Sequence, residues 1–401
     1  MKILYNIGIH LFEFLCKIVA LFNKKVRLML SGQKQTYSTL QTLGKDKKVA
    51  WFHCASLGEF EQARNLIEYF KAKYPDYQIL VSFFSPSGYE IRKNYNLADC
   101  VVYLPFDTKR KARKFISMAH PNIVFFVKYE FWYNYIRELK NVPLYQVSLI
   151  LRDNHYLLKT YSAWFRKQLK SFNHFFVQNQ QTKDILNKIG YTNVTISGDT
   201  RFDRVYKMSQ EKKDFPIIES FCQTDEKIFV AGSSWPPDEQ ILANVLNQKN
   251  YKLIIAPHLI GQDHIDNLLS LFPNSIAYSK ANEENVKEKK VLIIDCIGIL
   301  SYLYRFADLV HIGGGFGEGI HNVLEAAVFY KPVSLGPNHT KFQEAMDLIS
   351  LGAACPIKED TDLKYWLEKL ENENIYSSLC QKSGEYVKSH VGATETILKT
   401  I

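Results

Sequence analysis

Two series of short apolar, β-rich runs, alternating with helix-length segments, constrain the fold of this 401-residue chain most strongly. Strands that alternate with crossover helices form parallel sheets covered on both faces. The first series consists of the runs at 47–55, 77–84, 100–106, 121–129, 143–151, 174–179 and 194–199. The second consists of the runs at 228–234, 251–258, 291–296, 307–315 and 331–337. We therefore predict an α/β protein with two doubly wound domains.

The polar segment 207–226 separates the two series and contains no strand-like run. We interpret it as a linker between a first domain at 31–206 and a second domain at 227–401. In doubly wound sheets, ligands bind beyond the carboxyl ends of the strands. The loops that follow the strands are therefore the places where functional residues are expected.

The first 30 residues are apolar apart from a regular polar stripe. Asn6, His10, Glu13 and Lys17 recur at helical spacing, so residues 1–30 are predicted to form an amphipathic helix. A glutamate and a lysine at the centre of this segment would be costly inside a membrane span, and they interrupt the apolar region that a signal peptide needs. A helix lying on a membrane surface fits the pattern better. The alternative is a helix packed on its own domain.

The charge of the chain is divided unevenly. Residues 1–200 carry 29 lysines and arginines against 14 acidic residues, whereas residues 201–401 carry 21 against 27. A basic half indicates an anionic partner, which is nucleic acid, an anionic membrane or a phosphorylated substrate, unless it is only a solvated surface. The basic residues do not interleave with aromatic residues on a recognisable module, so we expect no nucleic-acid partner. Lys24, Lys25 and Arg27 follow the amphipathic segment and favour contact with anionic lipid.

The seven cysteines form no CxxC pair, which disfavours a disulfide framework or a zinc site.

The strand-like run 307–315 ends in a glycine-rich turn that follows Ile312. Gly313, Gly314 and Gly315 would let backbone amides approach a ligand closely. The spacing is not GxGxxG and no Walker lysine follows, so a dinucleotide site and a P-loop are both disfavoured. A phosphate site is one interpretation, and a flexible turn is the other.

A helix is predicted to begin near His321 and Asn322, with Glu325 in its first turns. Its amino terminus would attract a phosphate, and the glutamate could accept hydrogen bonds from ribose hydroxyls. Ser233 and Ser234 follow the first strand of the second domain and could contact the same ligand. They could equally cap the next helix.

In the first domain, three post-strand loops carry polar side chains. Ser85 and Ser87 lie in one loop, Glu130 in a second and Arg152 in a third. Because the strands are predicted to be parallel, these loops share one sheet edge. A surface ion pair between Glu130 and Arg152 would explain those two residues without any ligand.

Glu59 follows the first strand in the sequence ASLGE, residues 55–59. The spacing of Ser56 and Glu59 matches a capping box, in which the glutamate reaches back to the cap amide. Judged by this pattern alone, a structural role is favoured over that of a catalytic base.

Four motifs together resemble one family. They are ASLGE (55–59), YEFWYN (129–134), GDTRFDR (198–204) and GGGFGEGIHNVLEAAVFYKPVSLGPN (313–338). In this order they are similar to the 3-deoxy-D-manno-octulosonic acid (Kdo) transferases of lipid A biosynthesis, and the similarity extends over nearly the whole chain. The resemblance implies a GT-B glycosyltransferase fold, in which two Rossmann-like domains face a cleft and the last helix crosses back to the first domain.

The resemblance also implies roles for individual residues. Glu59 matches the catalytic glutamate of the family's S-x-G-E motif, and Arg152 matches an arginine that follows the next strand. Glu130 matches the acidic residue of the family's E-x-x-W-like loop, although the order here is Glu-Phe-Trp. The nucleotide-binding H-N-x-x-E pattern falls on His321, Asn322 and Glu325. His258 lies where the family tends to have an arginine-containing loop, and this chain has APHLIGQDH (256–264) there. That departure weakens the assignment of a phosphate contact to His258.

The family implies CMP-Kdo as donor and a lipid A precursor (lipid IVA) as acceptor, at the cytoplasmic face of the bacterial inner membrane. We expect an inverting enzyme with Glu59 as base and with no metal or cofactor. The only DxD sequence, at 360–362, follows no predicted strand and is better explained as a solvated turn. The alternatives are another GT-B transferase that uses a UDP-sugar on a lipid or peptidoglycan precursor, and an inactive membrane-attached binding protein.

Overall fold

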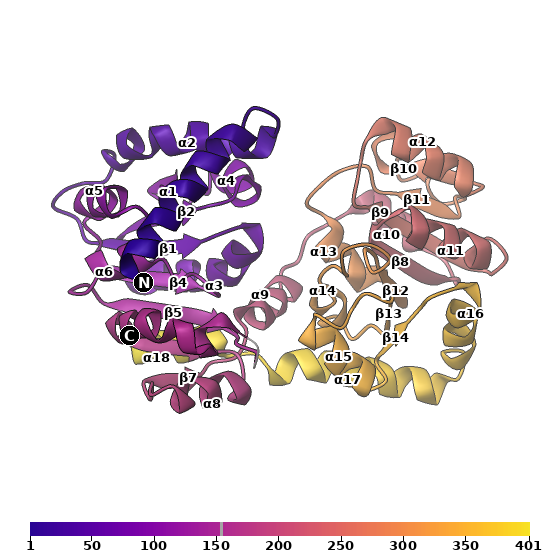
Figure 1. Cartoon of the computed structure of the whole chain (residues 1–401). Coiled ribbons are helices and arrows are strands. Elements are labelled where there is room, and N and C mark those ends of the chain that lie inside the picture. Colours follow the sequence, from indigo (N-terminus) through magenta and orange to yellow (C-terminus); the bar gives the residue numbers. More distant parts are fainter. Residues whose placement is uncertain (153–154) are drawn as a thin grey trace. The chain divides into compact units, whose positions relative to one another are not determined.

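The computed structural model describes residues 1–152 and 155–401. The chain divides into two compact units (Figure 1). The first consists of Met1–Arg204 together with Gly392–Ile401, and the second consists of Val205–Val391. Each unit contains one seven-stranded parallel sheet, so the predicted pair of doubly wound α/β folds is confirmed.

The sheet of the first unit has the strand order β3-β2-β1-β4-β5-β6-β7. Its strands are β1 (Val49–Cys54), β2 (Gln78–Phe83), β3 (Cys100–Tyr103), β4 (Ile123–Val127), β5 (Leu144–Leu149), β6 (His174–Val177) and β7 (Val194–Ile196). All seven correspond to predicted runs. The strand order reverses between β1 and β4, and the carboxyl ends at such a switch point are where ligands of these sheets bind.

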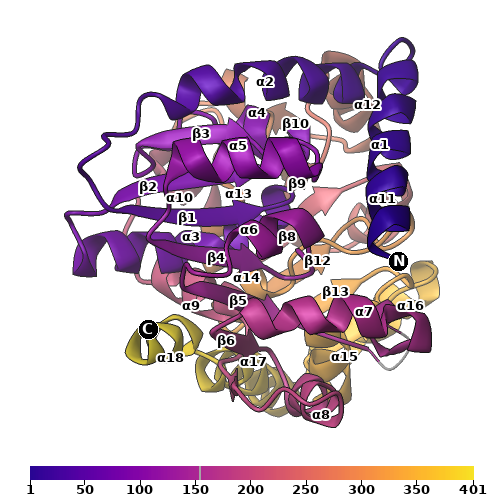
Figure 2. The same ribbon diagram turned by 60° about the vertical axis from the view of Figure 1, so that its left-hand side comes forward.

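Helices cover both faces of this sheet. They are α1 (Lys2–Val19), α2 (Lys24–Leu40), α3 (Leu57–Lys73), α4 (Pro86–Arg92), α5 (Lys109–Ala119), α6 (Tyr133–Glu138), α7 (Ala163–Arg166), α8 (Gln180–Lys188), the start of α9 (Thr200–Ser209) and α18 (Ala393–Thr400). Successive residues of a strand point to opposite faces. Trp51 therefore packs with Phe115 of α5 and Tyr135 of α6, whereas Phe52 packs with Phe70 of α3. Figure 2 shows the ribbons of α5 and α6 beside the sheet.

The last helix, α18, belongs to the first unit although Gly392, which precedes it, is 189 residues from Asp203 of α9. Ile397 and Leu398 are buried in the same core as α3. Asp203 accepts hydrogen bonds of 2.6 Å from the backbone amides of both Gly392 and Thr394, which fixes the start of α18.

The predicted helix over residues 1–30 is divided into α1 and α2, whose axes differ by 119°. The break follows from local capping. Asn23 caps α2 by accepting hydrogen bonds from Lys25 N (2.9 Å) and Val26 N (3.2 Å). Arg27 donates back to the carbonyl of Ala20 (3.0 Å), near the end of α1. Within the described residues no single helix is long and apolar enough to cross a membrane; α1 and α2 pass that test only as a bent pair.

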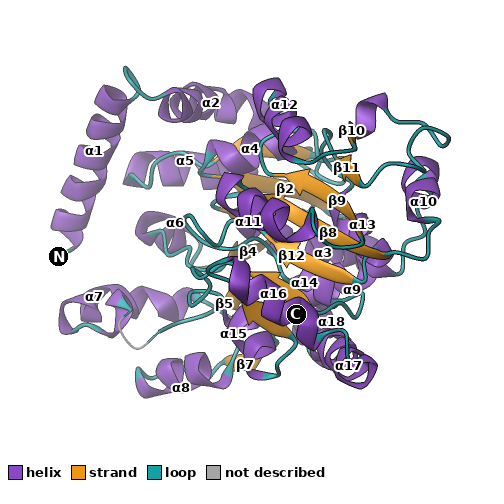
Figure 3. Ribbon diagram, turned by 90° about the vertical axis from the view of Figure 1, so that its right-hand side faces the viewer, coloured by secondary structure: helices purple, strands orange, loops and turns teal. Residues whose placement is uncertain are grey.

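Figure 3 shows α1 at the edge of the first unit. Asn6 and Glu13 of the polar stripe contact this unit, His10 and Lys17 are exposed, and most of the apolar side chains of α1 are exposed as well. Asn134 donates to Asn6 Oδ1 (3.0 Å), and Lys111 of α5 forms an ion pair of 3.0 Å with Glu13. The exposed apolar side chains of α1 and of the turn after it include Ile3, Leu4, Ile7, Leu11, Phe14, Leu15, Leu21 and Phe22. Phe22 is 87% exposed. This orientation is the reverse of the usual one for a helix on a globular domain.

The sheet of the second unit has the order β10-β11-β9-β8-β12-β13-β14, with its switch point between β8 and β12. Its strands are β8 (Lys227–Ser234), β9 (Tyr251–Pro257), β10 (Ser275–Ala277), β11 (Val291–Ile293), β12 (Leu309–Ile312), β13 (Val333–Leu335) and β14 (Ala354–Pro356). The two edge strands, β10 and β14, were not predicted, because Ser275–Ala277 and Ala354–Pro356 lie in segments that contain no continuous run of apolar β-branched or aromatic residues.

The helices of this unit are α10 (Pro216–Cys222), α11 (Pro236–Leu246), α12 (Gln262–Leu271), α13 (Leu300–Leu303), α14 (Leu324–Ala327), α15 (Gln343–Ser350), α16 (Asp360–Lys369) and α17 (Glu373–Ser389). The segment interpreted as a linker, 207–226, contains the end of α9 and all of α10. Ile218 and Phe221 of α10 are fully buried, so this segment contributes to the core of the second unit.

Candidate functional site

Glu59 lies at the switch point of the first sheet, directly after β1. Ser56 is the N-cap of α3, and its backbone amide donates to Glu59 Oε2 at 3.0 Å. The Ser56 hydroxyl contacts the same oxygen. The predicted capping box is therefore present. Both contacts use Oε2, and among the described residues Oε1 makes no hydrogen bond. One carboxylate oxygen can hold the helix start while the other is available for chemistry.

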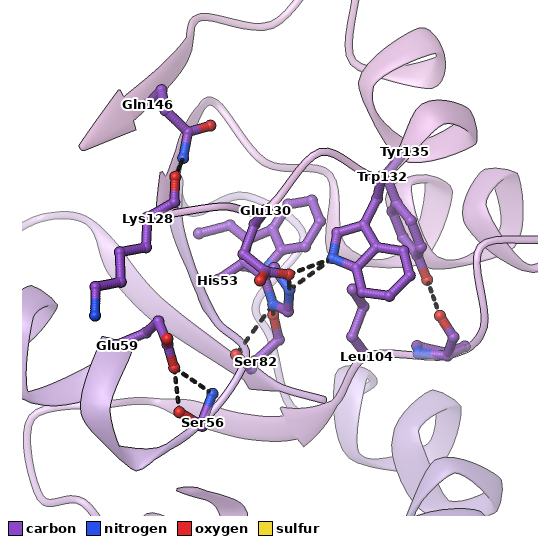
Figure 4. A network of polar contacts seen from close by, with 12 residues as sticks. His53, Ser56, Glu59, Ser82, Leu104, Lys128, Glu130, Trp132, Tyr135 and Gln146 are labelled. Atoms are coloured by element: carbon purple, nitrogen blue, oxygen red, sulfur yellow. Dashed lines mark hydrogen bonds and ion pairs between the residues drawn. The ribbon is translucent and has the colours of Figure 1, made fainter. Parts of the chain in front are cut away.

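Lys128 approaches Glu59 from the end of β4. Its φ of +66° places it in the left-handed region, and Gln146 donates to its carbonyl at 2.7 Å. Figure 4 shows its side chain directed toward the carboxylate of Glu59. Burial opposes ionisation of Asp199, but Arg201 and, more weakly, Lys128 hold its pKa below the ordinary value. The positive charge of Lys128 thus acts within the carboxyl edge of this sheet.

Glu130 is joined to a buried histidine on β1. Its Oε2 lies 3.0 Å from His53 Nε2 and accepts a hydrogen bond of 2.5 Å from Trp132 Nε1 (Figure 4). The side chain of His53 is fully buried, whereas that of Glu130 is 12% exposed. Both Glu130 and Glu59 raise the pKa of the Cys54 thiol, although burial is the larger cause. The two carboxylates therefore lie within electrostatic reach of one buried group.

The other predicted residues of the first unit have different surroundings. Ser85 is the N-cap of α4 and accepts a hydrogen bond from Ser87 N at 3.3 Å, so it has a structural role. Arg152 is exposed at the sheet edge. Burial raises the pKa of Tyr129, Arg152 lowers it and Glu59 raises it, so both charges act on the same hydroxyl. Arg152 and Glu59 therefore both lie within electrostatic reach of Tyr129.

In the second unit, Ser233 and Ser234 are the last two residues of β8. Ser233 adopts a φ of +52°. Ser234 is buried and donates to Glu239 Oε1 at 2.9 Å, and the same oxygen lies 3.0 Å from His264 Nε2. Burial raises the pKa of Glu239, against the opposing effect of His264. Ser234 is therefore part of an internal network.

Three rings stack beside these serines. Trp235 and His258 lie 4.7 Å apart by their centroids, and His258 and His321 also lie 4.7 Å apart. Burial lowers the pKa of His321, and the neighbouring His258 lowers it further. A neutral His321 favours such stacking, because two charged imidazoles would repel each other. The structure thus brings together two of the predicted nucleotide-binding residues, from the loops after β9 and β12.

The glycine turn packs against protein backbone. A Cβ on Gly313 would lie 2.4 Å from the carbonyl oxygen of Ser233, and one on Gly315 would lie 2.6 Å from Gly336 Cα. The amide of Gly313 donates to Gly232 O at 2.9 Å, and the amide of Gly314 donates to Asp238 Oδ2 at 3.1 Å. These two amides are therefore engaged within the unit, and the glycines are required by close packing.

The helix predicted near His321 begins at Leu324 and has only four residues, α14. A helix of one turn has little macrodipole, so the predicted phosphate site at its amino terminus is not supported. Asn322 precedes the helix and donates to Glu325 Oε1 at 3.2 Å. The two residues are adjacent as predicted, but they interact with each other.

Among the residues at 1–152 and 155–401, no group of three or more His, Cys, Asp or Glu side chains is arranged to hold a metal ion. The DxD sequence starts α16, where Asp362 accepts hydrogen bonds from Lys358 N (2.8 Å) and Glu359 N (3.2 Å). It is a helix cap.

Four residues of these two candidate sites, one site in each unit, were not predicted from the sequence. They are His53, Lys128, Trp235 and Asp238. His53 stands inside an apolar strand, and Lys128 ends one, so neither breaks the hydrophobic pattern. Asp238 is 1% exposed and lies in the first turn of α11, where an acidic residue is ordinary. The only available signal was the position of each residue at or near the end of a strand.

The family of 3-deoxy-D-manno-octulosonic-acid transferases (kdotransferases) matches residues 30–204. The chain is 26% identical over 343 residues to the 3-deoxy-D-manno-octulosonic acid transferase of Rickettsia felis, covering 82% of this chain and 72% of that protein. It is also 26% identical to the enzyme of that name from Aquifex aeolicus, covering 86% of this chain and 92% of that one. The chain resembles the Kdo transferases. These relatives support an enzyme of the glycosyltransferase class, as predicted.

Another relative is a bifunctional glycosyltransferase/methyltransferase of Fusobacterium nucleatum, 29% identical over 73% of this chain. The chain spans 48% of its length, about half. Among solved structures, UDP-GlcNAc 2-epimerase from Neisseria meningitidis matches with a TM-score of 0.60 at 15% identity, covering 88% of this chain and 99% of that one. Acinetobacter baumannii MurG matches with a TM-score of 0.54 at 12% identity, with the same coverage. Identities this low show the fold alone, which is of the GT-B type.

Proposed function

We propose that this protein transfers Kdo from CMP-Kdo to the hydroxyl of a lipid A precursor, with inversion and with Glu59 as the general base. The observation that carries the proposal is the position of Glu59. It lies at the switch point of the first sheet, and only one of its carboxylate oxygens is used for capping. The curated relatives named Kdo transferases support the choice of sugar.

In the proposed reaction, the acceptor hydroxyl oxygen attacks the anomeric carbon of Kdo. The bond from that carbon to the phosphate oxygen of CMP breaks, and CMP leaves with the electron pair. Glu59 takes the hydroxyl proton as the new bond forms. The transition state has oxocarbenium character. Arg152 and Lys128 offer positive charge at this edge of the sheet for the donor carboxylate or the acceptor phosphates.

The second unit would bind the nucleotide. The ring stack of Trp235, His258 and His321 offers aromatic surface beside the glycine turn. Polar groups for the ribose and the phosphate are offered by Ser233, in its left-handed conformation at the end of β8, and by the pair of Asn322 and Glu325. Stacking on aromatic side chains contributes ~1–3 kcal/mol per base in other nucleotide sites.

The test is transfer from CMP-Kdo to a tetraacylated lipid A precursor by the full chain, with UDP-sugars assayed in parallel. We expect a Kdo-modified product, competition by CMP, and no competition by UDP. Turnover with a UDP-sugar, inhibited by UDP, would replace this proposal with the other GT-B transferase. Binding of CMP without turnover of any donor would favour an inactive binding protein.

We further propose that the protein attaches to the cytoplasmic face of the inner membrane through α1. Many exposed apolar side chains lie together on α1. On the surface of a soluble protein, exposed apolar side chains are normally isolated from one another. Beside it lies a pocket of about 600 Å³, lined by His10 and by cationic residues of α5. These are Lys109, Arg110, Arg113 and Lys114. An apolar helix next to a cationic cluster matches the acyl region and the anionic headgroups of a bilayer.

This attachment predicts binding to vesicles that contain anionic lipid. The double substitution Ile7→Glu with Phe14→Glu places charge on two side chains that are each 58% exposed. We expect it to reduce sedimentation with phosphatidylglycerol-containing vesicles at least ~10-fold, because each apolar side chain contributes roughly 1.5–3 kcal/mol on leaving water. Ile297→Glu, at a site that is 85% exposed in the second unit, is the matched control and should bind as the wild type does.

Transfer to a detergent-dispersed acceptor should be unchanged in the double variant, which separates attachment from catalysis. Equal vesicle binding by wild type and double variant would contradict a role for α1.

A further inference from the structure

His53 lies at the centre of a chain of polar contacts that links the core of the first unit to the sheet edge (Figure 4). Trp51 Nε1 donates to Ser82 Oγ at 2.7 Å, and that oxygen lies 2.8 Å from His53 Nδ1. On the other side of the ring, His53 Nε2 lies 3.0 Å from Glu130 Oε2. Trp132 Nε1 donates to the same carboxylate oxygen at 2.5 Å. The chain begins in the core and ends at a partly exposed carboxylate.

The partner of Nε2 places a proton on that nitrogen. Glu130 Oε2 is a carboxylate oxygen at 3.0 Å, and it accepts the hydrogen bond that Nε2–H donates. On the other side of the ring, Nδ1 lies 2.8 Å from Ser82 Oγ, which accepts the indole N–H of Trp51, and 3.2 Å from the carbonyl oxygen of Ser82. Trp132 Nε1 also lies 3.1 Å from His53 Nε2, but its single proton is used by the closer carboxylate oxygen.

The second unit contains a similar contact between a histidine, a serine and a carboxylate, but there the carboxylate is fully buried. His311 on β12 lies 3.0 Å from Ser334 Oγ and 3.1 Å from Asp238 Oδ1. The side chain of Asp238 is fully buried, and its other oxygen accepts the amide of Gly314, so that histidine supports a loop. Glu130 is 12% exposed, and within the described part of the chain its Oε1 makes no hydrogen bond. Two donors hold one oxygen of Glu130, and the second oxygen is presented at the switch point.

We propose that His53 is a positioning residue, which holds Glu130 through Nε2–H so that its free oxygen accepts a hydrogen bond from a sugar hydroxyl of the substrate. This proposal rests on the proposed function, because the substrate is the one named there. It adds to the site a buried residue, His53, which lies outside the four motifs of the family resemblance.

Two nearly isosteric substitutions distinguish the contact of His53 Nε2 with Glu130 from the contact of Nδ1 with Ser82. The side-chain amide of His53→Gln reaches the position of Nε2 and can still donate to Glu130. The amide of His53→Asn reaches only the position of Nδ1 and serves Ser82. We expect His53→Asn to lower kcat/KM for Kdo transfer ~10- to 100-fold, the scale for partners that orient a functional side chain. His53→Gln should stay within ~3-fold of the wild type, because it keeps the donor that the proposal requires.

His174→Asn is the matched control. His174 begins β6 of the same sheet, at the strand end away from the switch point, and its Nε2 lies 2.8 Å from Thr195 Oγ1. Its activity should equal that of the wild type. Equal losses for His53→Gln and His53→Asn would indicate a role in packing only, and would overturn the proposal.

A double-mutant cycle shows whether His53 acts through Glu130. In a Glu130→Ala background, His53→Asn should cause little further loss, because coupled residues are not additive. Additive losses would overturn the proposal.

A readout that needs no turnover keeps this inference apart from the proposed function. A long-range ¹H–¹⁵N correlation spectrum of the full chain should contain one histidine in the Nε2–H form that is absent in His53→Gln. If that signal is present but no Kdo is transferred, the substrate assignment fails while the geometry stands. A His53 ring protonated at Nδ1 alone would contradict the inference even in an active enzyme.

Discussion

Replacing Glu59 by glutamine is expected to lower kcat for Kdo transfer by ~10²- to 10⁴-fold, the range for loss of a general base. An amide cannot take the proton of the acceptor hydroxyl. In the wild type, the backbone amide of Ser56 donates a hydrogen bond to Glu59 at 3.0 Å. The carbonyl oxygen of the glutamine can still accept this hydrogen bond, so α3 should begin at the same residue. The measurement is single-turnover transfer from CMP-Kdo, with thermal unfolding recorded for both proteins.

Ser56→Ala provides the matched control, since it removes the capping hydroxyl and leaves the carboxylate. We expect it to cost about 1 kcal/mol of unfolding free energy, as loss of an N-cap side chain does, with transfer reduced far less than in Glu59→Gln. If Glu59→Gln is fully active and Ser56→Ala is not, Glu59 is a helix cap. Glu130 would then be the next carboxylate to test as base.

Asp238→Ala is expected to have the largest effect on the stability of the second unit. Asp238 accepts hydrogen bonds from Trp235 N at 2.9 Å and Gly314 N at 3.1 Å, and it faces His311 Nε2 at 3.1 Å. Each buried donor left without a partner costs ~1–3 kcal/mol, so we expect a loss of about 3 kcal/mol or more. The measurement is urea unfolding followed by fluorescence.

The same substitution should weaken binding of CMP, because Asp238 ties the glycine turn to the start of α11. Asp263→Ala is the control, since Asp263 is an exposed residue in the first turn of α12. Both variants remove one carboxylate from a first helical turn, and only Asp238 is buried. Unchanged stability in Asp238→Ala would mean that the glycine turn is held by its backbone contacts alone.

The strands other than β10 and β14 could be predicted because buried parallel strands are continuous apolar runs. The site could be predicted less completely, for a physical reason. Glu59 and Ser56 are three residues apart, and a local pattern described their contact correctly. His53 and Glu130 are 77 residues apart, and only the pairing of β1 with β4 brings them together. No local pattern contains that information.

The amino-terminal helix illustrates the same limit. The stripe formed by Asn6, His10, Glu13 and Lys17 indicated an amphipathic helix, but not which side would face the first unit. Partners distant in sequence decide this. Asn134 and Lys111 bind the stripe and leave the apolar side outward. The prediction of a helix at His321 was wrong for a different reason. The loop that begins at the glycine turn continues to Val323, so only four helical residues follow it.

The position of α18 has a consequence for biosynthesis. The first unit is built from two separate pieces of chain, and the second unit is inserted between them. Asp203 and α3 make contacts with residues 392–401 that do not exist while a ribosome is still adding the second unit. Domains usually fold in order from the amino terminus during synthesis. Here the second unit can complete its core first, and the first unit must wait for its final helix.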